Sequence, residues 1–104
     1  QLGISLLVLE KYDEAEEVFE AVLQSGTEIV SDKYAALGGL AVISVFRQNL
    51  EDAEKYASQL RELVVYGKKF NLSIFDPIFG LMKNQEFVKR YLDALRQLGI
   101  PEKS

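Results

Sequence analysis

The chain has 104 residues, of which 48% are hydrophobic and 27% are charged, and it carries a formal net charge of −4. This composition predicts one water-soluble globular domain, and the acidic balance argues against a nucleic-acid-binding surface. Since cysteine and histidine are both absent from the sequence, disulfides, most transition-metal sites and the usual nucleophile–base pairs are excluded, and we expect no enzyme, no metal and no cofactor.

Two helices are predicted in the first quarter of the chain. Residues 1–9 form a short apolar segment, and residues 12–23 carry apolar side chains at helical spacing. The second helix should end at Gly26, because glycine readily adopts the left-handed conformation of a C-terminal cap. These two helices predict a first antiparallel hairpin over about residues 1–26.

A third helix is expected to begin near Ser31 or Asp32, either of which can cap it, and to end near Gln48. Its apolar run at residues 35–46 is shorter than the roughly 20 residues of a membrane span, so we interpret it as a buried helix and expect no membrane insertion. The Gly38-Gly39 pair lacks the further glycine and the lysine of a phosphate-binding loop. The pair therefore favours close helix packing.

A fourth helix follows, with Asn49 as its cap and acidic residues in its first turn, where they are favourable to the helix dipole. It should end before Gly67, and with the third helix it predicts a second hairpin over about residues 31–67. Strand signals are nearly absent from the whole chain. The sequence therefore predicts an all-α fold.

Two more helices are predicted near the C-terminus, of which the first is short. Asp76-Pro77 predicts a cap and first-turn proline that open a short helix to about Lys83. Asn84 should cap the final helix, and Gly99 should end it. We expect these helices to form a closing pair over about residues 76–98.

Two segments repeat one spacing. A leucine is followed directly by a small residue, an alanine lies twelve residues after that small residue, and another apolar residue lies sixteen residues after it. The positions are Leu2-Gly3, Ala15 and Phe19 in the first unit and Leu40-Ala41, Ala53 and Ala57 in the second. This pattern resembles the tetratricopeptide repeat (TPR), although the two units lie 38 residues apart rather than the usual 34. The resemblance implies antiparallel hairpins stacked as a short TPR-like α-solenoid, whereas an unrelated helical bundle is the alternative.

In the tetratricopeptide family the first helices of the hairpins line a concave groove. The resemblance therefore implies a protein–protein interaction scaffold that binds an apolar helix or an extended peptide segment in such a groove. The residues expected to line it are Ile4, Leu7, Val8, Gly38, Val42, Val45 and Phe46. Two alternatives stay open: the closing helices cover these side chains as core, or the domain is a structural stacking or self-association module of a longer helical array.

A dense acidic cluster occupies the second predicted helix and the turn before it. Its members are Glu10, Asp13, Glu14, Glu16, Glu17 and Glu20. The simplest interpretation is a solvated helix face. The alternative is electrostatic docking of a basic partner, because like charges one helical turn apart repel each other and such a partner would relieve the repulsion.

The expected partners are therefore proteins or peptides. Two hairpins and a short closing pair are fewer than the three repeats that such arrays normally need, so an apolar edge should be exposed and a homodimer is one way to cover it. That edge is expected at Ile4, Leu7, Val8, Val45 and Phe46. No secretory signal opens the sequence, which gives a cytoplasmic location as the expectation. Because the chain begins at Gln1 without an initiator methionine, we expect the single domain over residues 1–104 to be a piece of a longer protein.

Overall fold

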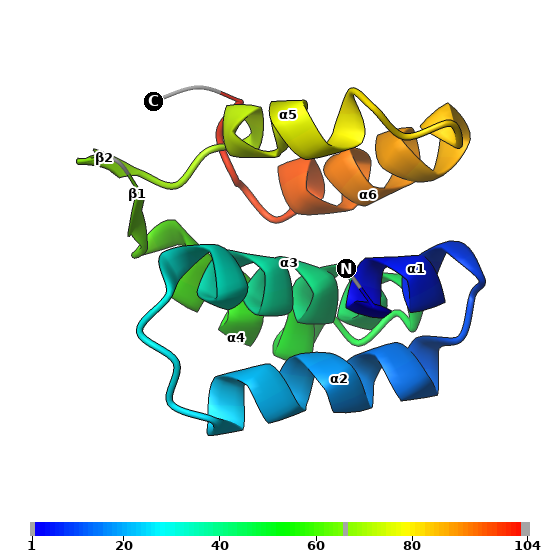
Figure 1. Cartoon of the computed structure of the whole chain (residues 1–104), viewed down its shortest axis with the longest axis horizontal. Helices are drawn as coiled ribbons and strands as arrows, with labels where there is room; N and C mark the ends of the chain where they lie inside the picture. Colours follow the sequence, from blue (N-terminus) through cyan, green and yellow to red (C-terminus); the bar gives the residue numbers. More distant parts are fainter. Residues whose placement is uncertain (1, 66, 103–104) are drawn as a thin grey trace.

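The computed structural model of the chain (Figure 1) describes residues 2–65 and 67–102, and the side chains of Leu2 and Ile78 lie outside that description. Helices make up 69% of the structure, which confirms the predicted all-α class. The predicted solenoid arrangement of tetratricopeptide type stays a prediction.

The main helices follow the predicted order, and short elements connect the fourth to the fifth. The α-helices are α1 (Leu2–Val8), α2 (Tyr12–Gln24), α3 (Val30–Phe46), α4 (Leu50–Arg61), α5 (Asp76–Phe79) and α6 (Gln85–Gln97). Between α4 and α5 lie the antiparallel strands β1 (Val64–Val65) and β2 (Lys68–Lys69) and the 3-10 helix η1 (Leu72–Phe75).

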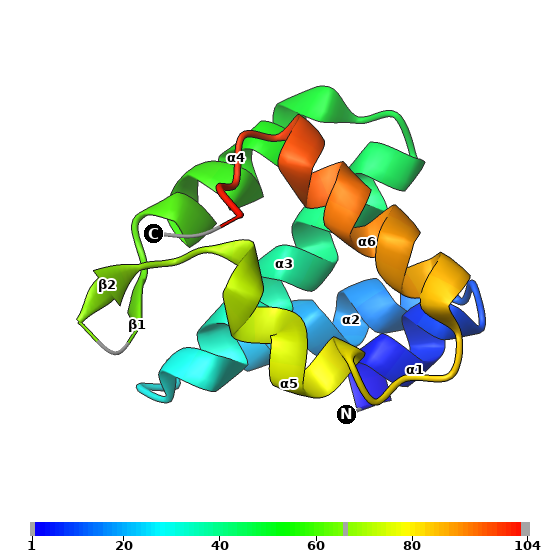
Figure 2. The ribbon, with the colours of Figure 1, turned by 90° about the horizontal axis from the view of Figure 1, so that it is seen from above.

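Helix α3 lies at the centre of the fold and packs against α1, α2, α4 and α6. Figure 1 shows α5 and α6 as a layer over α3, with α2 on the opposite side, and Figure 2 shows the same layer from above. A helix surrounded by other helices must be apolar around its whole circumference, and residues 35–44 of α3 are all buried. The apolar run therefore forms a buried helix, as the sequence predicts.

Glycines allow side chains from neighbouring helices to reach the backbone. A β-carbon added at Gly3 or at Gly39 would lie 2.3 Å from a ring atom of Phe19, so this ring from α2 fits between α1 and α3. A β-carbon added at Gly38 would lie 2.7 Å from the hydroxyl oxygen of Tyr91 on α6. Both approaches confirm that the Gly38-Gly39 pair serves close helix packing.

The small residues of the repeated spacing lie at helix contacts. The fully buried alanines are Ala15, Ala41, Ala53 and Ala57. The side chain of Leu2, the first position of the spacing, lies outside the described part of the structure. Burial of small residues is what the repeat predicts, and it is also compatible with an unrelated bundle.

The predicted caps are confirmed at several helix ends. The side-chain oxygen of Asn49 accepts a hydrogen bond from the backbone N–H of Asp52 at 3.2 Å, and that of Asn84 accepts one from the N–H of Phe87 at 3.0 Å. Gly26 follows α2 with φ +70°, in the left-handed region that favours glycine. These local signals set the helix ends that the sequence predicts.

Helix α3 begins at Val30, close to the predicted start, but the predicted cap is wrong, because neither Ser31 nor Asp32 caps the helix. The Asp32 carboxylate instead accepts a hydrogen bond from the hydroxyl of Thr27 at 3.3 Å. The same hydroxyl oxygen accepts one from the N–H of Ile29 at 3.1 Å. Thr27 therefore orders the turn before α3, and Asp32 joins that turn from within the helix rather than capping it.

Two other boundaries also differ from the prediction. Helix α3 ends at Phe46 because the chain turns at Gln48, which has φ +61°. Helix α5 ends at Phe79, four residues before the predicted end at Lys83. Strands β1 and β2 pair as a small antiparallel hairpin, and Gly67, which precedes β2, has φ +78°.

Candidate binding cleft

Helix α6 covers part of the groove that the sequence predicts. Leu7 and Val42 are 1% and 0% exposed, and Gly38 is buried against Tyr91 of α6. The remaining predicted groove residues are only partly buried, namely Ile4, Val8, Val45 and Phe46. Leu7, Gly38 and Val42 therefore belong to the core, and the expectation of an exposed apolar edge does not hold at Leu7.

Helix α6 is too firmly packed to be a removable cover. Its inner face buries Phe87, Val88, Tyr91, Ala94 and Leu95. Burial of a large apolar side chain contributes about 1.5–3 kcal/mol, so this face contributes on the order of 10 kcal/mol. Exposure of α6 to water would lose this favourable burial, so the helix belongs to the hydrophobic core.

Tyr91 of α6 places a polar atom inside this contact. Its side chain has no exposed surface, and its hydroxyl lacks a hydrogen-bond partner among the described residues. The ring centroids of Phe75 and Phe79 lie 5.6 and 5.0 Å from that of Tyr91. In these apolar surroundings, burial raises the pKa of Tyr91 well above its ordinary value.

Replacing Tyr91 with phenylalanine should make stability less sensitive to alkali. The folded protein keeps the hydroxyl protonated, whereas the unfolded chain ionises above about pH 10. This contribution to stability is fully present below about pH 10 and lost as the pH rises, by about 1.4 kcal/mol at about pH 11. Urea unfolding at about pH 8 and pH 11 should show that extra loss in the parent chain and not in Tyr91→Phe.

The control for this experiment is Leu50→Ala, because Leu50 is an exposed leucine of α4 that carries no ionisable group. It should leave the alkaline loss of the parent chain unchanged. Equal alkaline losses in the parent chain and Tyr91→Phe would show that the Tyr91 hydroxyl ionises in the folded state.

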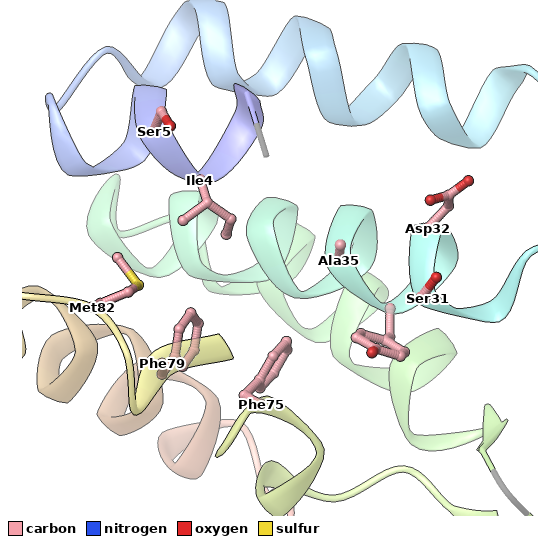
Figure 3. A pocket seen from close by; sticks show the side chains of 9 residues that line it. Ile4, Ser5, Ser31, Asp32, Ala35, Phe75, Phe79 and Met82 are labelled. Carbon is pink, nitrogen blue, oxygen red and sulfur yellow. The ribbon is translucent and has the colours of Figure 1, made fainter. Parts of the chain in front are cut away.

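A cleft of about 470 Å³ remains open between α1 and α3 on one side and the η1–α5 segment on the other. In Figure 3, Phe75 and Phe79 rise from one wall toward Ile4 and Ala35 on the other, and Met82 lies at one end. The lining residues are Ile4, Ser5, Ser31, Asp32, Tyr34, Ala35, Phe75, Phe79 and Met82. Most of this lining is apolar.

The polar groups of the cleft lie on α1 and at the start of α3. Ser31 and Asp32 are at the end of the cleft farthest from Met82 (Figure 3), and Ser5 lines the α1 side. Asp32 occupies the first turn of α3, where a negative charge is favourable to the helix dipole. Among the described lining residues there is no lysine or arginine, so the cleft favours a neutral or cationic ligand group.

Sequence reasoning found only Ile4 of this cleft. Phe75 and Phe79 are one helical turn apart, and their rings stack with centroids 5.0 Å apart. That spacing was a usable signal for an apolar wall. The position of this wall opposite α3 depends on how the η1–α5 segment folds back over the chain, and the pattern of neighbouring residues does not predict that position.

The predicted acidic cluster lies on the surface of α2 and the turn before it, away from the residues that line the cleft. Its crowded charges have a partner within the chain, because Arg47 forms ion pairs with Asp13 and, at 3.1 Å, with Glu16. Because Arg47 already relieves the repulsion at Asp13 and Glu16, that repulsion is no argument for a basic partner at these two residues. The acidic charge also affects a nearby tyrosine: burial, together with the charges of Glu20 and other nearby acids, raises the pKa of Tyr56.

The other members of the acidic cluster are placed as solvent-facing side chains. Glu10, Glu14 and Glu17 are exposed, and Glu20 is partly buried. Electrostatic docking at these residues stays a prediction. Within residues 2–65 and 67–102, the structure shows no group of three or more acidic side chains placed to hold a metal ion.

The described helices include none with the length and apolar character needed to cross a membrane. No family model, curated protein or solved structure matches this chain. The resemblance to tetratricopeptide repeats therefore rests on the residues of the sequence alone.

Proposed function

We propose that this domain is a protein-interaction module that docks an apolar segment of another polypeptide in the cleft between α1, α3 and α5. The observation that carries the proposal is the cleft itself, whose volume of about 470 Å³ is within the usual range of ligand sites. This location replaces the predicted groove under α6 and retains Ile4 from it.

The chemistry of the cleft suits a peptide segment. Ile4, Tyr34 and Met82 are partly exposed within it, so an apolar side chain that enters would be removed from water. The Ser31 and Asp32 side chains can accept hydrogen bonds from backbone or basic groups of the peptide. An apolar site with a few polar groups is typical of specific recognition.

Peptides selected from a random phage-displayed library against the intact chain should bind in this cleft. Met82→Glu places a charge in the apolar wall and should raise the dissociation constant of the selected peptides at least about tenfold. Fluorescence polarisation with the labelled synthetic peptides measures this change, and thermal unfolding verifies that the variant is folded.

The matched control is Leu50→Glu, which puts the same charge on a leucine of α4 that is 55% exposed and does not line the cleft. This variant should bind the peptides as the parent chain does. If Met82→Glu and Ile4→Glu both leave the affinity unchanged, the selected peptides bind elsewhere and the proposal is wrong.

A further inference from the structure

The loop between α5 and α6 carries the most exposed large apolar side chain among the described residues. Leu81 is 87% exposed, and Met82, which follows it, lines the cleft. Single exposed leucines are common on protein surfaces and by themselves indicate nothing. This leucine, however, directly precedes Met82 in the chain, so the loop that carries it begins at one end of an open apolar cleft.

The loop and the cleft are complementary in charge. The cleft contains Asp32 and, among its described lining residues, no basic group. The loop at residues 80–84 contains Lys83 and no acidic residue. Lys83 is exposed and forms no ion pair with another described residue. Opposite charges of this kind orient two surfaces as they meet.

We infer that the segment received by the cleft is the Leu81–Lys83 loop of a second copy of this chain. The inference rests on the proposed function, because it names the occupant of the same cleft. Leu81 of each copy enters the apolar part of the other copy's cleft. Lys83 of each copy pairs with Asp32 of the other.

The arrangement of the loop and the cleft fits a closed dimer. Because Met82 lines the cleft and belongs to the loop, the loop lies at the edge of the cleft. Two copies related by a twofold axis can then each donate a loop and receive one, as an isologous interface requires. One loop and one cleft per copy bury less than the roughly 1,600 Å² of a standard interface, so we expect a weak dimer.

Sedimentation equilibrium of the intact chain between about 10 and 500 µM should show a monomer–dimer equilibrium. Leu81→Asp should raise the dissociation constant of the dimer at least about tenfold, because two apolar contacts are lost from each dimer. The matched control is Leu50→Asp, at an exposed leucine outside the cleft, and it should leave the equilibrium unchanged.

A charge exchange tests the orientation of the two copies. Asp32→Lys and Lys83→Asp should each raise the dissociation constant about threefold or more, since like charges then face each other twice in a dimer. The chain that carries both substitutions should recover the parent affinity. Recovery requires direct pairing of these two side chains, because independent structural effects of the substitutions would add instead.

A strict monomer over the whole concentration range would overturn the inference. A dimer that is unaffected by Leu81→Asp, or a charge exchange that gives no recovery, would overturn it as well. Library peptides that still bind the cleft of a monomeric chain would show that the proposed docking function holds with another occupant. Failure of peptide binding is therefore distinguishable from failure of dimerisation.

Discussion

Phe19→Ala is expected to lower the free energy of unfolding by about 3–5 kcal/mol, the largest effect that we predict for a single substitution. The Phe19 ring is 1% exposed and fills the space between two glycines, Gly3 on α1 and Gly39 on α3. Removal of the ring deletes its buried apolar surface and leaves a cavity. The surrounding helices cannot close the cavity without shifting both α1 and α3 against α2.

Urea unfolding followed by circular dichroism measures this loss. The matched control is Phe46→Ala, which makes the same chemical change at a partly buried ring of α3 and should cost clearly less. A loss below about 1 kcal/mol for Phe19→Ala would show that Phe19 is not a core residue. The packing of α1 and α3 on α2 would then have to be different.

Gly38→Ala is expected to destabilise the protein by about 1–3 kcal/mol, although alanine is a better helix former than glycine. The added methyl group would lie 2.7 Å from the hydroxyl oxygen of Tyr91 and 3.4 Å from a ring atom of Phe75. Real β-carbons essentially never approach another atom as closely as 2.7 Å. The Tyr91 side chain, or helix α6 with it, would therefore have to shift away from α3.

Tyr91→Phe should have the opposite effect, because it removes a buried hydroxyl that has no hydrogen-bond partner among the described residues. An unsatisfied buried polar group costs about 1–3 kcal/mol, so this substitution should be neutral or stabilising. It also removes the oxygen atom nearest to the added methyl group. The double variant Gly38→Ala/Tyr91→Phe should therefore lose less stability than Gly38→Ala alone.

A double-mutant cycle measured by urea unfolding at neutral pH tests this coupling. We expect the two substitutions to be non-additive by about 0.5 kcal/mol or more, with the double variant more stable than the sum of single effects predicts. Strict additivity would mean that the Tyr91 hydroxyl does not contact α3 at Gly38. A clear loss of stability in Tyr91→Phe would mean that the hydroxyl makes a hydrogen bond.

The helical class and several helix ends could be predicted from the amino-acid sequence. Each of those features depends on neighbouring residues, such as the cap at Asn49, the cap at Asn84 and the left-handed turns at Gly26 and Gly99. The apolar run at residues 35–46 likewise marked the central helix, since a helix that is apolar on all sides must be buried. Helix caps, left-handed turns and the burial of a continuous apolar helix all depend on residues that are close together in the sequence.

The location of the cleft depends on the tertiary structure, whereas the cap of α3 was missed because of a local contact. The Thr27 hydroxyl donates a hydrogen bond to the Asp32 carboxylate, so Asp32 lies within the first turn of the helix and does not cap it. The predicted groove was apolar at Leu7 and Val42, but an apolar face has the same sequence whether a partner or the chain's own helix covers it. Helix α6 covers it here, because Tyr91 fits against Gly38 and buries the face within one molecule. The open cleft lies next to this covered face, and Phe75 and Phe79 line it opposite Ala35. These residues are far apart in the sequence, so no pattern of neighbouring residues could predict that they line one cleft.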